Sequence, residues 1–478
     1  MPKNMKNDLF GEFPKVSKSE WIEQVTVDLK GKDVKSLINS GLTEGVHLAP
    51  FYTLEDRDPN ELIHAYQYTI NPHQDISGAS PRFWSNVAAF DGRDEKNTNL
   101  QILEALQQGA DALLLQLDGN EDLELLLKDV APQYIEIYIK PLHEPIVVLG
   151  KYIEWIESVS VDKDAVKGGI LSDNFADSLT NKSHKSNVIR CSADLLEQAR
   201  PYPNFKALCL DTAVYHNAGA DAVQEIGFAV AAYVDLFDEL IKLGYDPAFL
   251  IQNTFIKSAA GEDFFKEIAK LRVMRILFHQ LTMLYHVELA PEDIFIFAET
   301  SFWTKSALDL ETNMLRNTTE AMAAILGGCN AVHVLRHDVA TSRKSTPFAQ
   351  RMALNISNLL KEEAYLDKHL DPVAGSYYLE KLISGLNAKI KDKLIQIEHL
   401  GGWWVEYQLG IIQKEVLEVR KTKIQEIAIG EITKVGVNKY LSPTDSDVLP
   451  LKLNQEQEYW QLFPSRASIL AEKPKQTK

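Results

Sequence analysis

Between about residues 80 and 340, short apolar stretches of strand length alternate with longer amphipathic stretches of helical spacing. The strand candidates, in chain order, are 83–90, 110–117, 134–140, 168–173, 187–191, 207–211, 249–255, 293–299 and 330–335. The clearest helix candidates are 98–109, 218–243, 264–285 and 312–326. Strands separated by helices are typical of a parallel α/β sheet. Such a run, over the roughly 250 residues usual for the fold, predicts a TIM-type (β/α)8 barrel.

The number of strands leaves one assignment open. Nine candidates compete for the eight strands of a barrel, so we expect either 83–90 or 187–191 to be misassigned. A doubly wound Rossmann sheet is the alternative for the same alternation. It is disfavoured because no Gly-x-Gly-x-x-Gly follows a first strand. We therefore predict that the barrel occupies residues 67–345.

The regions on either side of the barrel have a different character. Residues 1–66 are broken by proline and glycine and lack a core pattern, so we expect an extended N-terminal arm. Residues 346–440 are mostly of helical spacing, and the chain then becomes polar and ends in a lysine-rich tail. This predicts a C-terminal helical appendage and tail over 346–478.

Composition excludes several classes of protein. With 478 residues and a formal net charge of −17, the chain lacks the concentrated basic surface that nucleic-acid binding requires. No apolar run reaches the roughly 18 residues of a membrane-spanning helix, and MPKNMKNDLFGEF contains no apolar signal core. Cys191, Cys209 and Cys329 are too few for a disulfide framework, and we expect them to be buried and reduced. These features predict a cytoplasmic protein.

The segment DLETNMLRNTTEAMAAILGGCNAVHV (309–334) contains one complete helix-to-strand unit. Its side chains at helical spacing are Met314, Thr318, Ala321, Met322 and Ile325. We expect that face to be buried, with Arg316 and Glu320 directed elsewhere. Gly327-Gly328 suits the left-handed turn that ends a helix, and the following strand carries His333 at its C-terminal end.

Barrel enzymes carry their chemistry at the C-terminal ends of their strands. The polar residues expected there are Asp118, Asp173, Asp211, Glu299, Thr300, Ser301, His333 and Arg336. Such a set suits acid–base chemistry. Strand-end carboxylates equally cap helix N-termini, and a lone histidine is more often structural than catalytic. The residues alone leave both interpretations open.

The end of the predicted barrel resembles the methylmalonyl-CoA mutase family. Catalytic chains of that family carry a Thr-Ser-x-Trp strand end, Asp-x-x-x-Asn, an Arg-Thr-rich helix, Ala-Ala, a Gly-Gly-type turn and a His. The matching positions here are Thr300, Ser301, Trp303, Asp309, Asn313, Arg316, Glu320, Ala321, Ala323, Ala324, Gly327, Gly328 and His333. The motifs DPVAGSYYLE, IEHLGG and GVNKY follow in the family's order, so the resemblance covers about residues 20–440. It implies adenosylcobalamin-dependent isomerisation of acyl-CoA esters.

The substrate-binding residues of the family's catalytic chains are missing. Segment 81–90, where those chains carry a tyrosine, contains none. Val214 stands where they carry the histidine that hydrogen-bonds the thioester, and His216 is displaced by two residues. Asn253 and Phe255 occupy the Arg and Ser positions of a strand that grips the CoA ester.

The cobalamin-binding features are missing as well. The cobalt-ligating motif Asp-x-His-x-x-Gly has only a partial counterpart in Asp367-Lys368-His369, with Pro372 where the glycine must be. The residues after Tyr440 are too few for a doubly wound cobalamin domain.

These losses are similar to those of the small, β-type subunit of heterodimeric methylmalonyl-CoA mutase. The resemblance then implies that a large partner subunit binds adenosylcobalamin and CoA esters, that the arm wraps this partner, and that this chain carries no cofactor, metal or catalytic residue. Its degenerate barrel mouth would be marked by Thr300, Ser301, His333 and Asp211. One alternative is the catalytic barrel of a split acyl-CoA mutase that works with a separate cobalamin-domain protein. Another is a free-standing barrel that uses Asp118, Asp211 and His333 on a different ligand.

Overall fold

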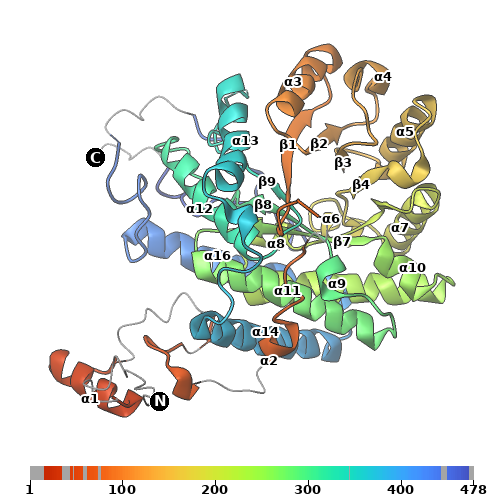
Figure 1. Cartoon of the computed structure of the whole chain (residues 1–478). Helices are drawn as coiled ribbons and strands as arrows, with labels where there is room; N and C mark the ends of the chain where they lie inside the picture. Colours follow the sequence, from red (N-terminus) through yellow and green to blue (C-terminus); the bar gives the residue numbers. More distant parts are fainter. Residues whose placement is uncertain are drawn as a thin grey trace, which may run out of the picture.

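A parallel sheet lies at the centre of the computed structural model and helices surround it (Figure 1). The structure describes residues 16–34, 44–46, 48–56, 62–73, 77–343, 345–442 and 449–472. The strands are β1 (Ser85–Asp91), β2 (Ala112–Leu117), β3 (Glu136–Pro141), β4 (Lys167–Ile170), β5 (Phe205–Lys206), β6 (Leu208–Asp211), β7 (Thr254–Ala260), β8 (Ile296–Thr300) and β9 (Ala331–His333). Their order in the sheet is β5-β4-β3-β2-β1-β9-β8-β7-β6, with all pairs parallel.

The two edges of the sheet belong to one stretch of chain. β5 and β6 are separated only by Ala207. β5 pairs with β4, whereas β6 pairs with β7. The sheet is therefore nearly closed, and counting β5 and β6 as one position leaves eight strand positions around the ring. The predicted TIM-type barrel is confirmed at this level.

Helices form the outer layer of the barrel. The long helices between and after the strands are α3 (Glu95–Gln107), α5 (Pro145–Ser158), α7 (Lys185–Ala199), α9 (Ala222–Lys242), α11 (Phe264–Leu284), α12 (Thr312–Leu326) and α13 (Pro347–Glu362). Shorter ones are α4 (Leu123–Leu126), α6 (Asn174–Asp177), α8 (Ala213–Asn217) and α10 (Pro247–Gln252). Side-chain capping stabilises the N-termini of many of these helices. Asp221, for example, caps α9 in a capping box with Gln224. The helices predicted over 218–243, 264–285 and 312–326 are confirmed as α9, α11 and α12.

The open strand assignment is settled in favour of the first candidate. Residues 83–90 overlap β1, whereas 187–191 lie within α7 and were wrongly predicted as a strand. The buried side chains of α7 include Val188, Leu195 and Ala199, a helical spacing that extends beyond the five-residue window. Cys191 is accordingly a half-buried helix residue and not a strand residue.

The predicted strand 249–255 is also wrong over most of its length. Residues up to Gln252 belong to α10, and β7 begins only at Thr254. Asp246 accepts hydrogen bonds from the N–H groups of Ala248 and Phe249, and a proline occupies the first helical turn. The capping hydrogen bonds and the proline favour a helix more strongly than the aromatic and branched residues that follow favour a strand.

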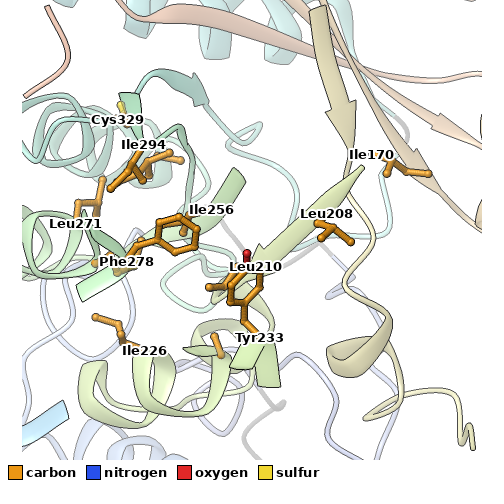
Figure 2. Packing of buried hydrophobic residues seen from close by; sticks show 14 of the residues in the cluster. Ile170, Leu208, Leu210, Ile226, Tyr233, Ile256, Leu271, Phe278, Ile294 and Cys329 are labelled. Atoms are coloured by element: carbon orange, nitrogen blue, oxygen red, sulfur yellow. The ribbon is translucent and has the colours of Figure 1, made fainter. Parts of the chain in front are cut away.

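The alternation of side chains along each strand separates two apolar cores. In β8, Phe297 faces the barrel interior, whereas Ile296 and Ala298 face the helices. The interior core comprises Val87, Ala112, Leu114, Tyr138, Leu171, Cys209, Phe255, Phe297 and Ala331. The ring of Tyr138 lies 4.9 Å from that of Phe297 and 6.2 Å from that of Phe255, between ring centroids. The larger outer core packs strands against helices, and Figure 2 shows part of it around Ile256.

The chain after the barrel contains further helices. They include α14 (Tyr377–His399), α15 (Trp403–Leu409) and α16 (Ile411–Ile429). The Nε1 atom of Trp403 donates a hydrogen bond of 2.8 Å to the hydroxyl of Tyr215, which ties α15 to the barrel. At the other end of the chain, α1 (Lys18–Asp28) has no buried residue and lies apart from the barrel helices (Figure 1). No helix in the described ranges is both long and apolar enough to span a membrane.

Candidate site at the barrel mouth

A row of charged and polar side chains crosses the barrel interior at the C-terminal ends of β6 to β9. The Nζ atom of Lys257 lies 2.9 Å from Oδ2 of Asp211 and 3.5 Å from Oε1 of Glu299. The Oε2 atom of Glu299 lies 3.8 Å from Nδ1 of His333. The strand register brings these residues together, because Asp211 is paired with Lys257 and Glu299 with His333. We call Asp211, Lys257, Glu299 and His333 the mouth row.

Lys257 offsets part of the negative charge of the two carboxylates in the mouth row. Burial alone lowers the pKa of Lys257, but the carboxylates of Asp211 and Glu299 outweigh it and hold this pKa above its ordinary value. Burial alone raises the pKa of Glu299, but Lys257, His333 and Lys140 together outweigh it and hold this pKa below its ordinary value. The four side chains are only 10% to 13% exposed. The cation is therefore shared between two carboxylates of its own chain.

The neighbouring strand-end carboxylates cap local structure. Asp173 accepts hydrogen bonds of 3.1 Å from the N–H groups of Phe175 and Ala176 at the start of α6, and another from the N–H of Asp211. Burial raises the pKa of Asp173 to about 7. Asp118 accepts a hydrogen bond from the N–H of Asn120 in the loop after β2. The helix-capping interpretation therefore agrees with the contacts of Asp173, whereas Asp118 stabilises a loop.

Thr300 and Ser301 do not join the mouth row. Because Glu299 faces the interior, the next residue of β8 faces outward. Thr300 is fully buried, and its Oγ1 atom accepts a hydrogen bond of 2.8 Å from the N–H of Leu335. The Oγ atom of Ser301 lies 2.8 Å from the Nε2 atom of His216.

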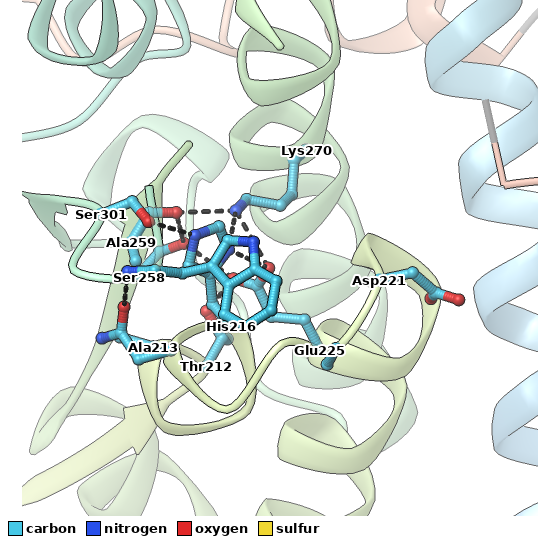
Figure 3. Close-up of polar contacts among 12 residues, drawn as sticks. Thr212, Ala213, His216, Asp221, Glu225, Ser258, Ala259, Lys270 and Ser301 are labelled. Carbon is cyan, nitrogen blue, oxygen red and sulfur yellow. Dashed lines mark hydrogen bonds and ion pairs between the residues drawn. The ribbon is translucent and has the colours of Figure 1, made fainter. Parts of the chain in front are cut away.

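A second polar cluster, which we call the buried network, lies between the barrel and its helices (Figure 3). It consists of His216, Glu225, Lys270 and Ser301. The Oε2 atom of Glu225 lies 3.1 Å from Nδ1 of His216 and 3.0 Å from Nζ of Lys270. Lys270 is wholly buried and also donates a hydrogen bond of 2.6 Å to the carbonyl of Ala259. These contacts hold α8, α9, α11 and the end of β8 together.

Sequence reasoning missed Lys257, Glu225 and Lys270. Lys257 follows apolar residues in TFIKSAA, and Lys270 lies in the mainly apolar helix α11. A lysine inside a segment that must be buried indicates a buried ion pair, because an isolated buried charge is too costly. That signal was present in the sequence, although it does not identify the partners.

The motif residues of α12 have structural contacts. Glu320, which was expected to lie off the buried face, is fully buried and forms an ion pair with Lys305. The Nδ2 atom of Asn313 donates hydrogen bonds of 2.8 Å to the carbonyls of Ser306 and His337. Asn313 thereby joins the loops that follow β8 and β9, so polar residues as well as apolar ones form the buried face of this helix. The left-handed turn after the helix is confirmed at Gly328, where φ is +95°.

The partial cobalt-ligand string Asp367-Lys368-His369 does not suit a cobalamin at the barrel mouth, because it lies at the opposite end of the strands. The carbonyl of Asp367 accepts a hydrogen bond from the N–H of Arg82, and its carboxylate contacts Ser80, both just before β1. His369 is exposed there and lies away from the mouth, which is at the other end of the strands.

Fold and site together define a parallel α/β barrel protein whose mouth is occupied by its own ion pairs. The family model for methylmalonyl-CoA mutase matches residues 114–462, and the chain belongs to this family. It is 30% identical over 451 residues to the methylmalonyl-CoA mutase small subunit of Porphyromonas gingivalis, covering 92% of this chain and 72% of that protein. The small subunit from Streptomyces virginiae is 27% identical, with coverage of 92% and 73%.

Two further similarities are more distant. The methylmalonyl-CoA mutase of Escherichia coli is 25% identical over 88% of this chain and 64% of its own length. A solved dihydropteroate synthase from Xanthomonas albilineans matches with a TM-score of 0.30 and 15% identity, over 61% of this chain and 99% of that one. A superposition of that quality carries no argument about function.

Proposed function

We propose that this chain is the small, non-catalytic subunit of an adenosylcobalamin-dependent methylmalonyl-CoA mutase. A large partner subunit would bind the cofactor and interconvert methylmalonyl-CoA and succinyl-CoA, and this chain would stabilise and orient it. The observation that carries the proposal is the mouth row. A substrate at the mouth of this barrel would have to displace the ion pairs of Lys257, which lie above the packed rings of Tyr138 and Phe297.

The names of the similar proteins support the same assignment. The relatives from Porphyromonas gingivalis and Streptomyces virginiae are both named small subunits, and each matches 92% of this chain. A small subunit implies a large one. Since the string at Asp367 is unsuited to cobalamin, we assign adenosylcobalamin and the CoA esters to the partner chain.

The N-terminal arm is the part of the chain that we assign to contact with the partner. We propose a division into an arm over 1–66, a barrel over 67–345 and an appendage over 346–478. No side chain of α1 is buried, and Val27 on this helix is 70% exposed. The arm also contacts its own barrel, because Glu44 pairs with Lys266 of α11 at 2.9 Å. This leaves the outer face of α1 for a second chain.

Purification from native cells tests the proposal. The tagged chain would be isolated under mild conditions, and the proteins that accompany it identified by mass spectrometry. We expect a large mutase chain that holds both a barrel and a cobalamin domain. A small, separate cobalamin-domain protein would instead favour the split-enzyme alternative.

A pair of variants tests the role of the arm in the same experiment. Val27→Asp places a charge on the exposed face of α1, whereas Val159→Asp places one on a residue that is 40% exposed at the end of α5. We expect the first to reduce recovery of the partner and the second to leave it unchanged. Equal recovery with both variants would remove the arm from the interface.

A further inference from the structure

A cavity of about 750 Å³ lies beside the barrel mouth, between α3 and α13. β1 and α3 form one wall, and the segment after β9 together with α13 forms the other. Its size falls within the roughly 300–1,000 Å³ usual for small-molecule sites. We call it the α3/α13 cavity.

Cationic and donor side chains are concentrated in its lining. Arg93, Arg336, Arg351 and His333 all border the cavity. His333 is only 8% exposed, and its buried Nδ1 atom makes no hydrogen bond, since Glu299 is too far away at 3.8 Å. The Nη1 atom of Arg336, by contrast, is held in an ion pair 3.2 Å from Oδ1 of Asp338. A buried polar atom without a hydrogen bond, such as Nδ1 of His333, indicates a missing ligand or ordered water.

Two helices begin at this cavity. Asp94, the N-cap of α3, makes no capping hydrogen bond with its side chain, and Asn97 in the first turn lines the cavity. The start of α13 contributes Pro347, Gln350 and Arg351, and Thr346 caps this helix by accepting a hydrogen bond from the N–H of Ala349. Helix N-termini carry partial positive charge, which favours an anion.

The lining also contains three carboxylates, and two of them have partners within the lining itself. Asp91 binds the guanidinium of Arg93, with Oδ1 2.8 Å from Nε. Glu104 accepts a hydrogen bond of 2.8 Å from the amide of Gln108. Asp94 is exposed to solvent. Arg351 has no ion-pair partner in the described part of the chain, so its charge is available to a ligand.

We propose that the α3/α13 cavity binds a phosphate-bearing small molecule of nucleotide size, with the phosphate held by Arg351 and the first turns of α3 and α13. Amides and small apolar residues, among them Gln101, Gln116 and Ala353, line the remaining volume and suit a sugar and base. In TIM-type barrels the loops after the last strands frequently hold phosphate. The inference does not rest on the proposed function, because this cavity lies beside the filled barrel axis.

Calorimetric titration of the full-length chain tests the inference. The probes are 5′-AMP, adenosine and inorganic phosphate, and the proteins are the wild type, Arg351→Gln and Arg343→Gln. Arg343 is an exposed arginine of the preceding loop and does not line the cavity, so it is a matched control. We expect 5′-AMP to bind with a Kd below about 1 mM, and adenosine to bind at least tenfold more weakly. Arg351→Gln should weaken 5′-AMP binding at least tenfold, and Arg343→Gln should not change it.

Several results would overturn the inference. Absence of binding by both 5′-AMP and inorganic phosphate would exclude a phosphate site. Equal affinity for 5′-AMP and adenosine would show that phosphate is not recognised, and equal weakening in both variants would place the binding elsewhere. Because both arginines are exposed, thermal unfolding of the two variants serves as a check that they remain folded.

Discussion

The Nε2 atom of His216 lies 2.8 Å from the Oγ atom of Ser301, in the layer between the barrel and its helices. Ser301 was expected at the barrel mouth, whereas His216 was expected to be displaced by two residues from the position of the family's histidine. Glu225 pairs with both His216 and Lys270, so these contacts together link β8 to α8, α9 and α11. The contact is consistent with a structural role for both side chains.

Replacement of Ser301 by alanine should reduce stability. The change removes the partner of a buried imidazole nitrogen, which costs about 1–3 kcal/mol. Ser158→Ala removes an exposed hydroxyl that bonds only to a carbonyl of its own helix, and should cost no more than about 0.5 kcal/mol. Urea unfolding of both variants measures the difference, and equal midpoints would refute a stabilising contact at Ser301.

Lys257→Met should be among the most destabilising single changes in the barrel. It leaves Asp211 and Glu299 buried without their shared cation, which typically costs about 3–5 kcal/mol. Lys140 at the end of β3 is exposed, so Lys140→Met should cost less than about 1 kcal/mol. Chemical unfolding at pH 7 distinguishes the two. A small effect of Lys257→Met would mean that the mouth row is loosely packed.

The stability difference between the wild type and Glu299→Gln should depend on pH. The pKa of Glu299 is held below its ordinary value in the folded state, so the unfolded chain takes up this proton first as the pH falls. The stability contributed by the carboxylate is present above about pH 4.5 and is lost progressively as the pH falls from there toward the lower folded-state pKa. The difference in unfolding free energy between the two proteins should therefore be the same at pH 7 and pH 6, and smaller at pH 4. A constant difference across this range would contradict the assignment.

Phe297→Ala tests whether the barrel interior is a packed core. Its ring is fully buried against Tyr138, and truncation should cost about 3–5 kcal/mol because a cavity remains. Phe265→Ala removes a ring that is 49% exposed and should cost much less. Thermal unfolding of the two variants measures the difference in their stability. If Phe297→Ala were neutral, the interior would already contain space that a ligand could use.

The fold was largely predictable from periodicity, and the errors have physical causes. The predicted bounds of the helix over 312–326 are the same as those of α12, because the apolar spacing and the double glycine indicate the same helix end. The strand assigned to 187–191 failed because a five-residue apolar window cannot distinguish a strand from one turn of the amphipathic helix α7. The strand assigned to 249–255 failed because the helix-starting signal at Asp246 was overlooked.

The site was predictable only in part. Asp211 and His333 were placed at strand ends, and both lie in the mouth row. Lys257, which bridges the two carboxylates of this row, was missed because the predicted strand 249–255 ended before it, whereas β7 continues to Ala260. Thr300 was expected at the mouth. It directly follows Glu299 in β8, and successive side chains of a strand point to opposite faces, so the side chain of Thr300 points outward.

The most direct test of the central claim is the turnover of methylmalonyl-CoA by the assembled complex when this chain carries Asp211→Asn. The substitution changes a strand-end carboxylate at the mouth with almost no change in shape. We predict a turnover number within twofold of wild type per assembled complex, because the chemistry takes place on the partner. A loss of 100-fold or more, with assembly intact, would show that this barrel is itself catalytic and would contradict the account.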